Sequence, residues 1–539
     1  MTALFGLVNS SLLRWPRVIL THTLHRQTVK KLSGLAITFC LLLWISVFPQ
    51  TAMAESKNIL IVSDAAAQAE TLDPQKEFSE KNHIACQQIF DGLIRFGPNC
   101  DFEPALATSW ERLDPLRMRF HLRPNVKFHN GETFDAEAVK FTLERYLDPK
   151  TGFPAIGYLA SIDHAEIIDP HTIDIVTKYP DGLLLNRIAG FILISPPKYI
   201  KEKGEEFFAT HPIGTGAFIL DKWDKDKQIV FSANKNYWMN GYPKLDGLVF
   251  MFIPPNERIK ALFSGKIQLV TNLPGTQTRA VTEHPNTKIM KKPAFRTLSA
   301  YFNSSSKILK DVRIRKALNY ATNKKDLIRY DLMGNGAEIA ALSIPGEYGH
   351  NSDLRPYEFD TDKARKLLKD AGYPEGFELK VLAKESTARA VKIITTQLAN
   401  IGIKTDTVLV PDAKVIPEFK KHAYDMAIAD PPDPMCHSYF IQSVTLFSKS
   451  PYSLGTDPVY DEKLIDMAST IDEPLQEQKA KALDKYVYDN ALSIFTYQQW
   501  DVMALNKKLV FEPYLTGMPY FFAAYFKNSQ PRKLNHGKN

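Results

Sequence analysis

The chain has 539 residues, of which 44% are hydrophobic and 24% charged, with a formal net charge of +7. That length is enough for two or three compact units. Residues 1–54 hold five of the basic residues and no Asp or Glu, so the remainder is close to neutral. A nearly neutral protein has no electrostatic drive toward nucleic acid or a membrane surface, and we predict neither as a partner.

The N-terminal segment has the three regions of a secretory signal. Basic residues come first, the apolar run LAITFCLLLWISVF follows at 35–48, and Ala52-Met53-Ala54 then supplies a small-x-small cleavage site. This order predicts a signal peptide at 1–54 that is cleaved near Ala54, with an uncleaved membrane anchor as the alternative. The run is short for a membrane span, and no later window is long and apolar enough for one. We therefore expect a periplasmic protein without stable membrane insertion after cleavage.

Three cysteines follow the signal region, namely Cys86, Cys100 and Cys436. An oxidising compartment permits disulfides, and Cys86 and Cys100 are near enough in sequence to pair. Cys86 also shares a helical spacing with Ile89 and Leu93, which is typical of a buried thiol. Both possibilities stay open for Cys86, and at least one of the three cysteines is left over.

Strands and helices alternate along the chain, which predicts an α/β protein. Strands are predicted at 58–64, 117–123, 171–179, 228–234, 247–253, 296–303, 377–384, 403–410, 424–430 and 492–500. Helices are predicted at 81–96 (running into a strand), 255–265, 310–332 (one or two helices), 361–372, 388–402 and 476–491. The three segments between 377 and 410 predict a βαβ unit. The helix at 361–372 is expected to begin at Thr361 or Asp362 as its N-cap and to stop at Gly372.

The segment VKFHNGETFDAEAVKFTLER at 126–145 holds acids, bases and a histidine, so it invites a catalytic interpretation. Every part of it also has a structural use. Asn130-Gly131 favours a tight reversal, and Asp135 can cap the helix that follows. The apolar positions of that helix form one stripe: Ala136, Val139, Leu143 and Tyr146. We interpret the segment as scaffold.

The sequence lacks the common enzyme signatures, including the nucleophile elbow, the phosphate-binding loop, the zinc-protease helix and the dinucleotide fingerprint. Its 13 histidines form no dense cluster. We therefore predict no enzyme, no cofactor and no metal site. A secreted hydrolase stays the rival function, and it would need a nucleophile–base pair or a metal site.

Six blocks in order resemble the family 5 extracellular solute-binding proteins, the dipeptide-, oligopeptide- and nickel-binding subunits of ABC importers. They are LATSWE…RMRFHLRPNVKFHNGETFDAEAVKFTLER, HPIGTGAFIL, NKNYW, LDGLVFMFIPPNERIKALFSGKIQLV, YFNSSSKILKDVRIRKALNYATNKKDLI and ANIGIKTD. The resemblance extends from about Ala69 to about Trp500. It implies a monomer that binds a small peptide or similar solute and works with an inner-membrane ABC permease.

The resemblance implies a large two-lobed α/β fold of the periplasmic-binding-protein type with an extra subdomain. Lobe one would comprise 55–297, with the extra subdomain at about 102–205, and the return segment 498–539. Lobe two would comprise 298–497. Two strands would cross between the lobes near Leu298 and Tyr497, and closure about this hinge would enclose the ligand.

Dipeptide-binding relatives hold the α-ammonium of the peptide with an aspartate just before an Asp-Pro pair. Here Asp430 stands three residues before Asp433-Pro434, at the matching spacing. A carboxylate in a closing cleft needs a cation, which an ammonium supplies. The relatives carry tryptophan and glycine where this chain has Ile428-Ala429. The alternative is a loop aspartate that caps a turn in a proline-rich segment.

The relatives hold the peptide carboxylate with an arginine after the strand of the βαβ unit. Lys384 is nearest to that position, and Arg389 is the substitute candidate. Lysine lacks the bidentate fork of arginine, so its capture of a carboxylate would be less directional. The alternative for both is an exposed basic residue at a helix start. The loop Glu70-Thr71-Leu72 aligns with a segment that lines the cleft.

Nickel-binding relatives have an arginine in the segment that matches 191–197, where this chain has Ile192 and Leu193. They also have an aromatic residue where this chain has Pro432. We therefore expect short peptides as ligands, with an opine, a metal chelate or a similar solute as the alternative.

Overall fold

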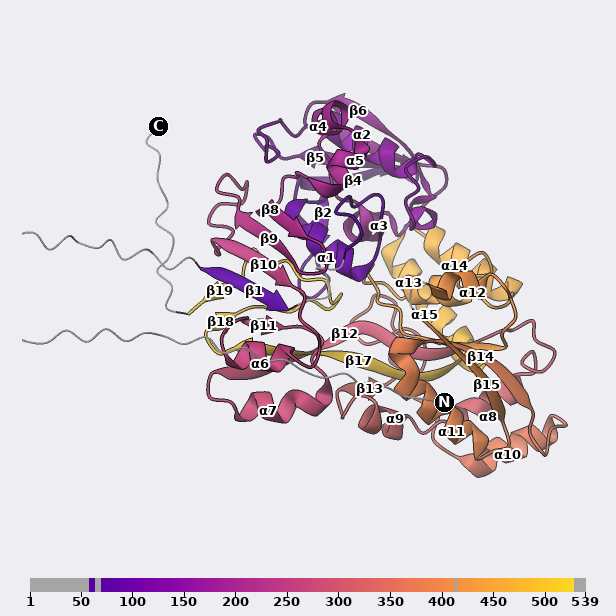
Figure 1. Cartoon of the computed structure of the whole chain (residues 1–539). Coiled ribbons are helices and arrows are strands. Elements are labelled where there is room, and N and C mark those ends of the chain that lie inside the picture. Colours follow the sequence, from indigo (N-terminus) through magenta and orange to yellow (C-terminus); the bar gives the residue numbers. More distant parts are fainter. Residues whose placement is uncertain (1–57, 64–68, 412–413, 528–539) are drawn as a thin grey trace, which may run out of the picture. The chain divides into compact units, whose positions relative to one another are not determined.

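The computed structural model describes residues 58–63, 69–411 and 414–527. The chain divides into two compact units, 1–56 and 57–539, and every described element belongs to the second. The predicted signal peptide and its cleavage near Ala54 lie outside the described residues. Helices and strands alternate through the second unit (Figure 1), as the sequence predicts. Among the helices that the structure describes, none has the length and apolar character to cross a membrane.

One large sheet runs through the unit, with eleven strands among the described residues. Its strands are β1 (Ile59–Ser63), β8 (Phe218–Asp224), β9 (Gln228–Ala233), β10 (Gly247–Met251), β11 (Leu269–Val270), β12 (Thr287–Phe302), β13 (Gly336–Glu338), β14 (Glu378–Lys384), β15 (Lys404–Val410), β16 (Met426–Ala429) and β17 (Ser493–Asn506). The order is β15-β14-β16-β12-β17-β11-β1-β10-β9-β8, and β13 pairs with β17. Because β14 and β15 are parallel, the predicted βαβ unit is confirmed.

The long strands β12 and β17 join the two ends of this sheet. They pair in antiparallel register, and Leu298 lies opposite Tyr497. The ladder shifts register between Pro293 and Thr297, where β12 bulges. Both strands are longer than the sequence predicts, because their mutual pairing carries them through Lys291, Lys292 and Pro293.

A separate antiparallel sheet lies outside the large one, in the order β4-β5-β7-β6. Its strands are β4 (Ala107–Asp114), β5 (Arg117–Leu122), β6 (Ile162–Asp169) and β7 (Thr172–Thr177), and two small hairpins pair β2 (Ile94–Phe96) with β3 (Phe102–Pro104) and β18 (Leu509–Val510) with β19 (Tyr525–Phe526). Asp135 caps helix α2 (Ala136–Leu147) by accepting from the N–H groups of Glu137 and Ala138. The apolar stripe of α2 is buried, so the segment 126–145 has the structural role that its sequence predicts.

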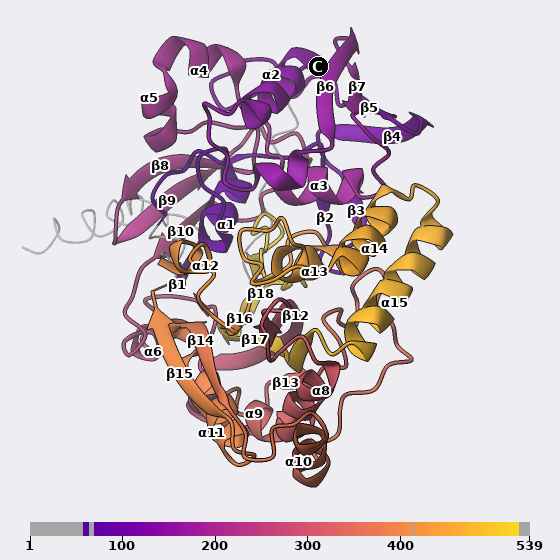
Figure 2. The same ribbon diagram turned by 90° about the vertical axis from the view of Figure 1, so that its right-hand side faces the viewer.

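Besides α2, the helices that the structure describes are α1 (Glu80–Ile89), α3 (Leu184–Phe191), α4 (Pro197–Lys203), α5 (Glu205–Thr210), α6 (Arg258–Phe263), α7 (Thr278–Glu283), α8 (Val312–Ala321), α9 (Lys324–Tyr330), α10 (Thr361–Asp370), α11 (Ala388–Ala399), α12 (Val415–Phe419), α13 (Tyr439–Leu446), α14 (Pro458–Ser469) and α15 (Glu473–Asp489). Figure 2 shows α2, α4 and α5 near the four-stranded sheet, and α8, α9, α10 and α11 at the opposite end of the unit, near β14 and β15. The expected N-cap of α10 is wrong. Asp360 caps it by accepting from the N–H of Lys363 at 2.8 Å, because Thr361 is already the first helical residue.

The three largest hydrophobic cores among the described residues hold these layers together. One lies beneath β1, β9 and β10, and another lies between β14, β16 and helices α8 and α11. The third extends from the four-stranded sheet through α3 to α13 and α15. This third core therefore joins residues of predicted lobe one to residues of predicted lobe two.

The disulfide differs from the pair that the sequence suggests. Cys100 is bonded to Cys436, with the two Cα atoms 5.9 Å apart, and Cys86 is a free, buried thiol. A bond between Cys86 and Cys100 is therefore excluded, and the prediction of a buried thiol is confirmed. Helix α1 turns Cys86 into the core, where its S–H lies 3.5 Å from the carbonyl of Leu72. Burial raises the pKa of this thiol well above its ordinary value.

Candidate functional site

Asp430 and Lys384 meet at one edge of the large sheet. Lys384 is the last residue of β14, and Asp430 follows the last residue of β16. The two strands are parallel neighbours, so their carboxyl ends lie side by side. Such an edge is where open α/β sheets bind ligands. The Nζ of Lys384 lies 3.9 Å from Oδ1 of Asp430, so the structure brings two of the predicted site residues together.

Arg296 is a member of the same cluster that the sequence analysis missed. It lies in the bulge of β12 and bridges to Pro432, outside the regular ladder with β17. Bulges often re-aim a side chain in this way. One guanidinium nitrogen lies 3.6 Å from Oδ2 of Asp430 and donates to the Asp430 carbonyl at 3.4 Å. The other forms an ion pair with Glu80 of α1.

These four side chains form a charged cluster with two cations and two carboxylates, which we call the ionic cluster (Glu80, Arg296, Lys384 and Asp430). Between 19% and 23% of each side chain is exposed. Burial lowers the pKa of Arg296, but the nearby carboxylates of Glu80, Asp430 and Asp501 raise it beyond its ordinary value. The arginine therefore stays charged despite its surroundings.

Asp430 has no short ionic contact within this cluster, since its two cations lie 3.6 and 3.9 Å away. Charge-assisted N–H···O bonds are usually about 2.7–2.9 Å long. Both distances leave room for a closer donor. The Asp430 carboxylate thus lies near two cations but forms a short ion pair with neither of them.

Arg389 lies in α11 and points to a different carboxylate. Its guanidinium donates to the backbone carbonyl of Asp331 at 3.1 Å. The Asp331 side chain accepts from the hydroxyl of Tyr497 at 2.5 Å. Burial raises the pKa of Asp331, while Tyr497 and Arg389 oppose this rise and the charge of Asp430 adds to it. Asp331 therefore lies within electrostatic range of Asp430, and Arg389 contacts Asp331 rather than the ionic cluster.

The loop Glu70-Thr71-Leu72 is tied to predicted lobe one. Thr71 and Leu72 both donate to the carbonyl of Ala209, and the Leu72 side chain is fully buried in the core. The Glu70 N–H donates to Glu77 at 3.2 Å. The residue from this part of the chain that reaches the ionic cluster is Glu80. A role of the loop in lining a ligand cleft stays a prediction.

The structure also encloses a small cavity near α1 and α3. This cavity, of about 10 Å³, lies among α1, α3, Pro434 and the segment 514–520. This is room for about one water molecule. The ring of Phe191 lies against Tyr158 and Phe440, with centroids 5.2 and 6.3 Å away.

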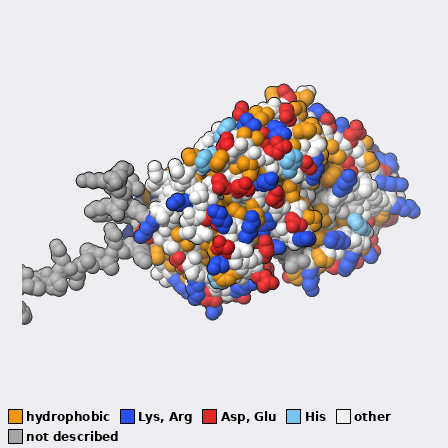
Figure 3. Space-filling model, turned by 90° about the horizontal axis from the view of Figure 1, so that it is seen from above, with side chains coloured by type: hydrophobic (Ala, Val, Ile, Leu, Met, Phe, Trp, Pro, Cys, Tyr) orange, Lys and Arg blue, Asp and Glu red, His pale blue; other side chains and the backbone are white. Residues whose placement is uncertain are grey.

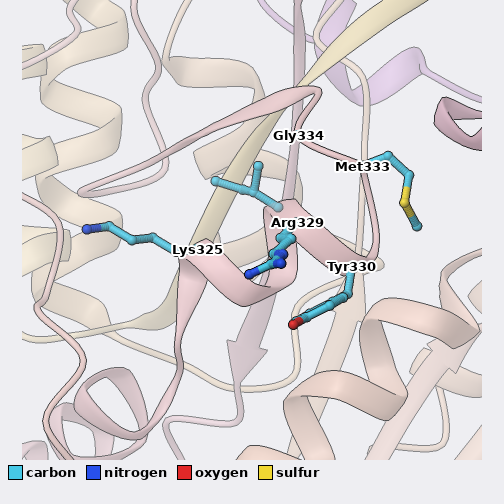
Figure 4. A pocket seen from close by; sticks show the side chains of 6 residues that line it. Lys325, Arg329, Tyr330, Met333 and Gly334 are labelled. Carbon is cyan, nitrogen blue, oxygen red and sulfur yellow. The ribbon is translucent and has the colours of Figure 1, made fainter. Parts of the chain in front are cut away.

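A second concavity lies on the outside of α9 and has a volume of about 540 Å³ (Figure 4). It is lined by Lys325, Ile328, Arg329, Tyr330, Met333 and Gly334. This open hollow has two cations and, among the described residues that line it, no carboxylate. It lacks the paired charges of the ionic cluster.

Acidic and basic side chains are interspersed on the face drawn in Figure 3, so this face has no large patch of a single charge sign. In the described part of the chain, no group of three or more His, Cys, Asp or Glu residues is placed to hold a metal ion.

Comparison with known proteins decides the family. A model of the bacterial extracellular solute-binding proteins, family 5 Middle, matches residues 101–443. The chain belongs to this family. Its members are solute-binding proteins rather than enzymes, and they are periplasmic.

Curated relatives are similar over part of their length. The glutathione-binding protein GsiB of Escherichia coli O1:K1 / APEC is 30% identical over 344 residues, which is 62% of this chain and 66% of the relative. The match therefore spans slightly less than two thirds of that relative. GsiB of Salmonella paratyphi A is 28% identical over 370 residues, or 67% of this chain and 70% of the relative.

Solved structures establish the fold as a two-lobed periplasmic binding protein. DppA of Helicobacter pylori in complex with the peptide STSA is similar with a TM-score of 0.77 and 24% identity, covering 87% of this chain and 98% of that one. AgaA of A. tumefacien R10 in complex with agropinic acid is similar with a TM-score of 0.76 and 23% identity, covering 88% and 99%.

Proposed function

We propose that this protein is the periplasmic substrate-binding subunit of an ABC importer, and that it encloses short peptides between its lobes. In this proposal it acts as a monomer, is released by signal cleavage near Ala54, and delivers its ligand to an inner-membrane permease. The proposed lobes keep the predicted boundaries, with 55–297 and 498–539 in lobe one and 298–497 in lobe two. The paired strands β12 and β17 would be the hinge.

The observation that carries the peptide proposal is the position of Asp430. Its carboxylate lies at the carboxyl edge of the sheet, partly exposed, with its nearest cations at 3.6 and 3.9 Å. A ligand ammonium could approach it more closely than either cation does. The names of similar proteins support the same ligand class, since GsiB is a glutathione-binding protein and DppA was solved with a peptide. Lys384, with Arg389 as the second candidate, would face the peptide carboxylate, and Glu70, Thr71 and Leu72 would line the cleft.

The first test is a thermal unfolding screen of the mature protein with pools of di- to tetrapeptides. A ligand at a hundred times its Kd adds about 2.7 kcal/mol to the free energy of unfolding. Stabilisation by at least one pool is the expected result. Mass spectrometry of small molecules that co-purify from the periplasm would identify the ligand directly. An opine or a metal chelate in that sample, with no response to peptides, would favour the alternative solute.

The second test addresses Asp430. Asp430→Ala removes the partner of the ligand ammonium, and such losses cost about 2–5 kcal/mol, which weakens Kd by roughly thirtyfold to several thousandfold. N-acetylated peptides should bind the wild type poorly because they carry no ammonium. Asp362→Ala is the matched control, because the Asp362 side chain is 95% exposed on α10. Equal binding of free and acetylated peptides, with Asp430→Ala like the wild type, would show that Asp430 only forms a turn.

A further inference from the structure

Arg296 connects carboxylates of both proposed lobes. Glu80 belongs to α1 in lobe one, whereas Asp430 follows β16 in lobe two. Arg296 lies between them in the bulge of β12, next to the proposed hinge, and contacts both. The bulge is what directs it there, since its backbone bridges to Pro432 rather than continuing the ladder with β17.

The charges of the ionic cluster balance only as a set. Arg296 and Lys384 face Glu80 and Asp430, and all four side chains are largely withdrawn from water. A ligand with only a cation, or only an anion, would leave one of these charges without a partner in a poorly solvated place, which is costly. A ligand with one charge of each sign preserves the balance. The cluster therefore selects for a zwitterion.

We propose that Arg296 is the specificity-determining residue that binds the carboxylate of a zwitterionic ligand, while Asp430 is freed to bind its ammonium. This inference rests on the proposed function and names the ligand class of the same site. Arg296 is better suited than Lys384, because its guanidinium presents several N–H donors in a fixed plane and so binds a carboxylate more directionally than a lysine ammonium does. The Glu80 ion pair holds the guanidinium in position for this exchange.

The test compares three forms of one dipeptide: free, N-acetylated and C-amidated. The wild type should bind the free form at least about thirtyfold more tightly than the amide, the size expected for a lost charge-assisted contact in a cleft. Arg296→Gln should remove this preference and bind both forms with similar, weak affinity. It should keep the preference for the free form over the acetylated form, because Asp430 is intact. Arg279→Gln is the matched control, because the Arg279 side chain is 87% exposed on α7, and it should keep the full preference for a free carboxylate. Lys384→Gln tests the other cation of the cluster and should retain more of this preference than Arg296→Gln does.

The outcomes separate the inference from the proposed function. If the wild type binds none of the three forms, the peptide proposal fails. If it binds the free form and Arg296→Gln still discriminates against the amide, the inference about Arg296 fails. If Lys384→Gln instead loses the preference for a free carboxylate, then Lys384 rather than Arg296 binds the ligand carboxylate. Because Arg296→Gln could also disturb folding, Arg296→Lys provides a second variant that keeps the charge without the fork and should recover part of the preference.

The disulfide supports a second, independent inference. Cys100 lies in the loop between β2 and β3, and Cys436 lies between β16 and α13, 336 residues later. On the proposed boundaries these loops belong to different lobes. Around the bond, the Leu515 N–H and the Lys292 ammonium donate to the Pro98 carbonyl, and the Asp433 N–H donates to Phe295. The bond therefore lies beside the first strand of the proposed hinge.

We infer that the Cys100–Cys436 bond is a third, covalent connection between the lobes and limits how far they open. Two strands alone permit a wide rotation, as in hinge closure generally. A bond between loops of the two lobes removes the most open conformations. Reduction of this bond, by two electrons and two protons from an external thiol, would restore them.

The experiment measures the radius of gyration of the ligand-free protein by small-angle X-ray scattering. The oxidised wild type should be more compact than the Cys100→Ser/Cys436→Ser double variant, and dithiothreitol should expand the wild type but not the double variant. Cys86→Ser is the matched control, because its disulfide is intact and it should respond like the wild type. Circular dichroism confirms that each protein is folded. An unchanged radius after reduction, with both thiols free by mass spectrometry, would overturn the inference.

Discussion

Two aspartates in one loop, Asp430 and Asp433, have opposite environments. Asp430 is about one fifth exposed and reaches its cations only at 3.6 and 3.9 Å. Asp433 is fully buried and accepts from the N–H groups of Met435 at 2.7 Å and His437 at 2.9 Å. The Asp430 carboxylate is available to a ligand, whereas both oxygens of Asp433 accept hydrogen bonds from backbone N–H groups. Two acidic residues three positions apart thus differ in what they can do: Asp430 can bind a ligand, whereas Asp433 stabilises the loop.

The carboxyl of Glu347 adds to this difference. It is buried near Asp433 and accepts from the Ile344 N–H at 3.0 Å. Burial raises the pKa of Asp433 to about 7, and burial together with the charge of Asp433 raises the pKa of Glu347. Two neighbouring carboxyl groups in an apolar place hold a proton that an exposed pair would lose. The pKa values of both buried carboxyl groups therefore lie above the ordinary range of an exposed Asp or Glu.

The largest expected effect comes from removing the buried member. Asp433→Ala leaves the N–H groups of Met435 and His437 buried without acceptors, which should lower the free energy of unfolding by about 2–5 kcal/mol. Urea unfolding at constant pH measures this. Asp433→Asn keeps one acceptor oxygen and should be less damaging. A loss below about 1 kcal/mol for the alanine variant would show that water replaces the carboxylate, and the contrast between the two aspartates would disappear.

A smaller effect is expected from pH. A carboxyl group with a raised folded-state pKa binds its proton more tightly when folded, so its stabilisation is complete below the unfolded pKa of about 4 and is lost as pH rises through about 7. The free energy of unfolding should therefore fall by about 2 kcal/mol between pH 5 and pH 8. Asp484, whose pKa burial also raises to about 7, contributes in the same direction.

Glu347→Gln tests the origin of this slope. The variant removes one titrating carboxyl group and the charge that faces Asp433, so stability should vary less steeply between pH 5 and pH 8. Parallel urea titrations of the wild type and the variant provide the comparison. An unchanged slope would assign the pH dependence to Asp484 or to groups elsewhere.

The smallest effect is expected from the exposed member. Asp430→Ala removes two long ion pairs, but Arg296 keeps its ion pair with Glu80 and the Lys384 side chain is about one fifth exposed. The free energy of unfolding should therefore fall by only about 1 kcal/mol. The same urea experiment measures it. If Asp430→Ala destabilised the protein as much as Asp433→Ala, both aspartates would be structural. A loss of peptide binding in that variant would then no longer show that Asp430 contacts the ligand.

Local patterns in the sequence determined much of this protein. Alternating and helical periodicities located the βαβ unit at 377–410, and Asp135 was identified as the cap of α2 from its position before an apolar stripe. Ordered blocks of residues identified the family that the comparisons establish. The proximity of Lys384 and Asp430 was also predictable in part, because both follow parallel strands. The helix cap and the βαβ unit depend on patterns within short stretches, and the family blocks can be recognised one by one along the chain.

Only the tertiary structure decided the features that join distant segments. Arg296 has no local signal, because Lys291, Lys292 and Pro293 interrupt the strand pattern before it, and its role arises from a bulge in the ladder between β12 and β17. Cys100 and Cys436 are 336 residues apart, and their loops meet where both contact β12. Residues with similar sequence surroundings, such as Asp430 and Asp433, differ in burial because the fold covers one and leaves the other open. Contacts of this kind depend on packing between segments, which periodicity along the chain does not encode.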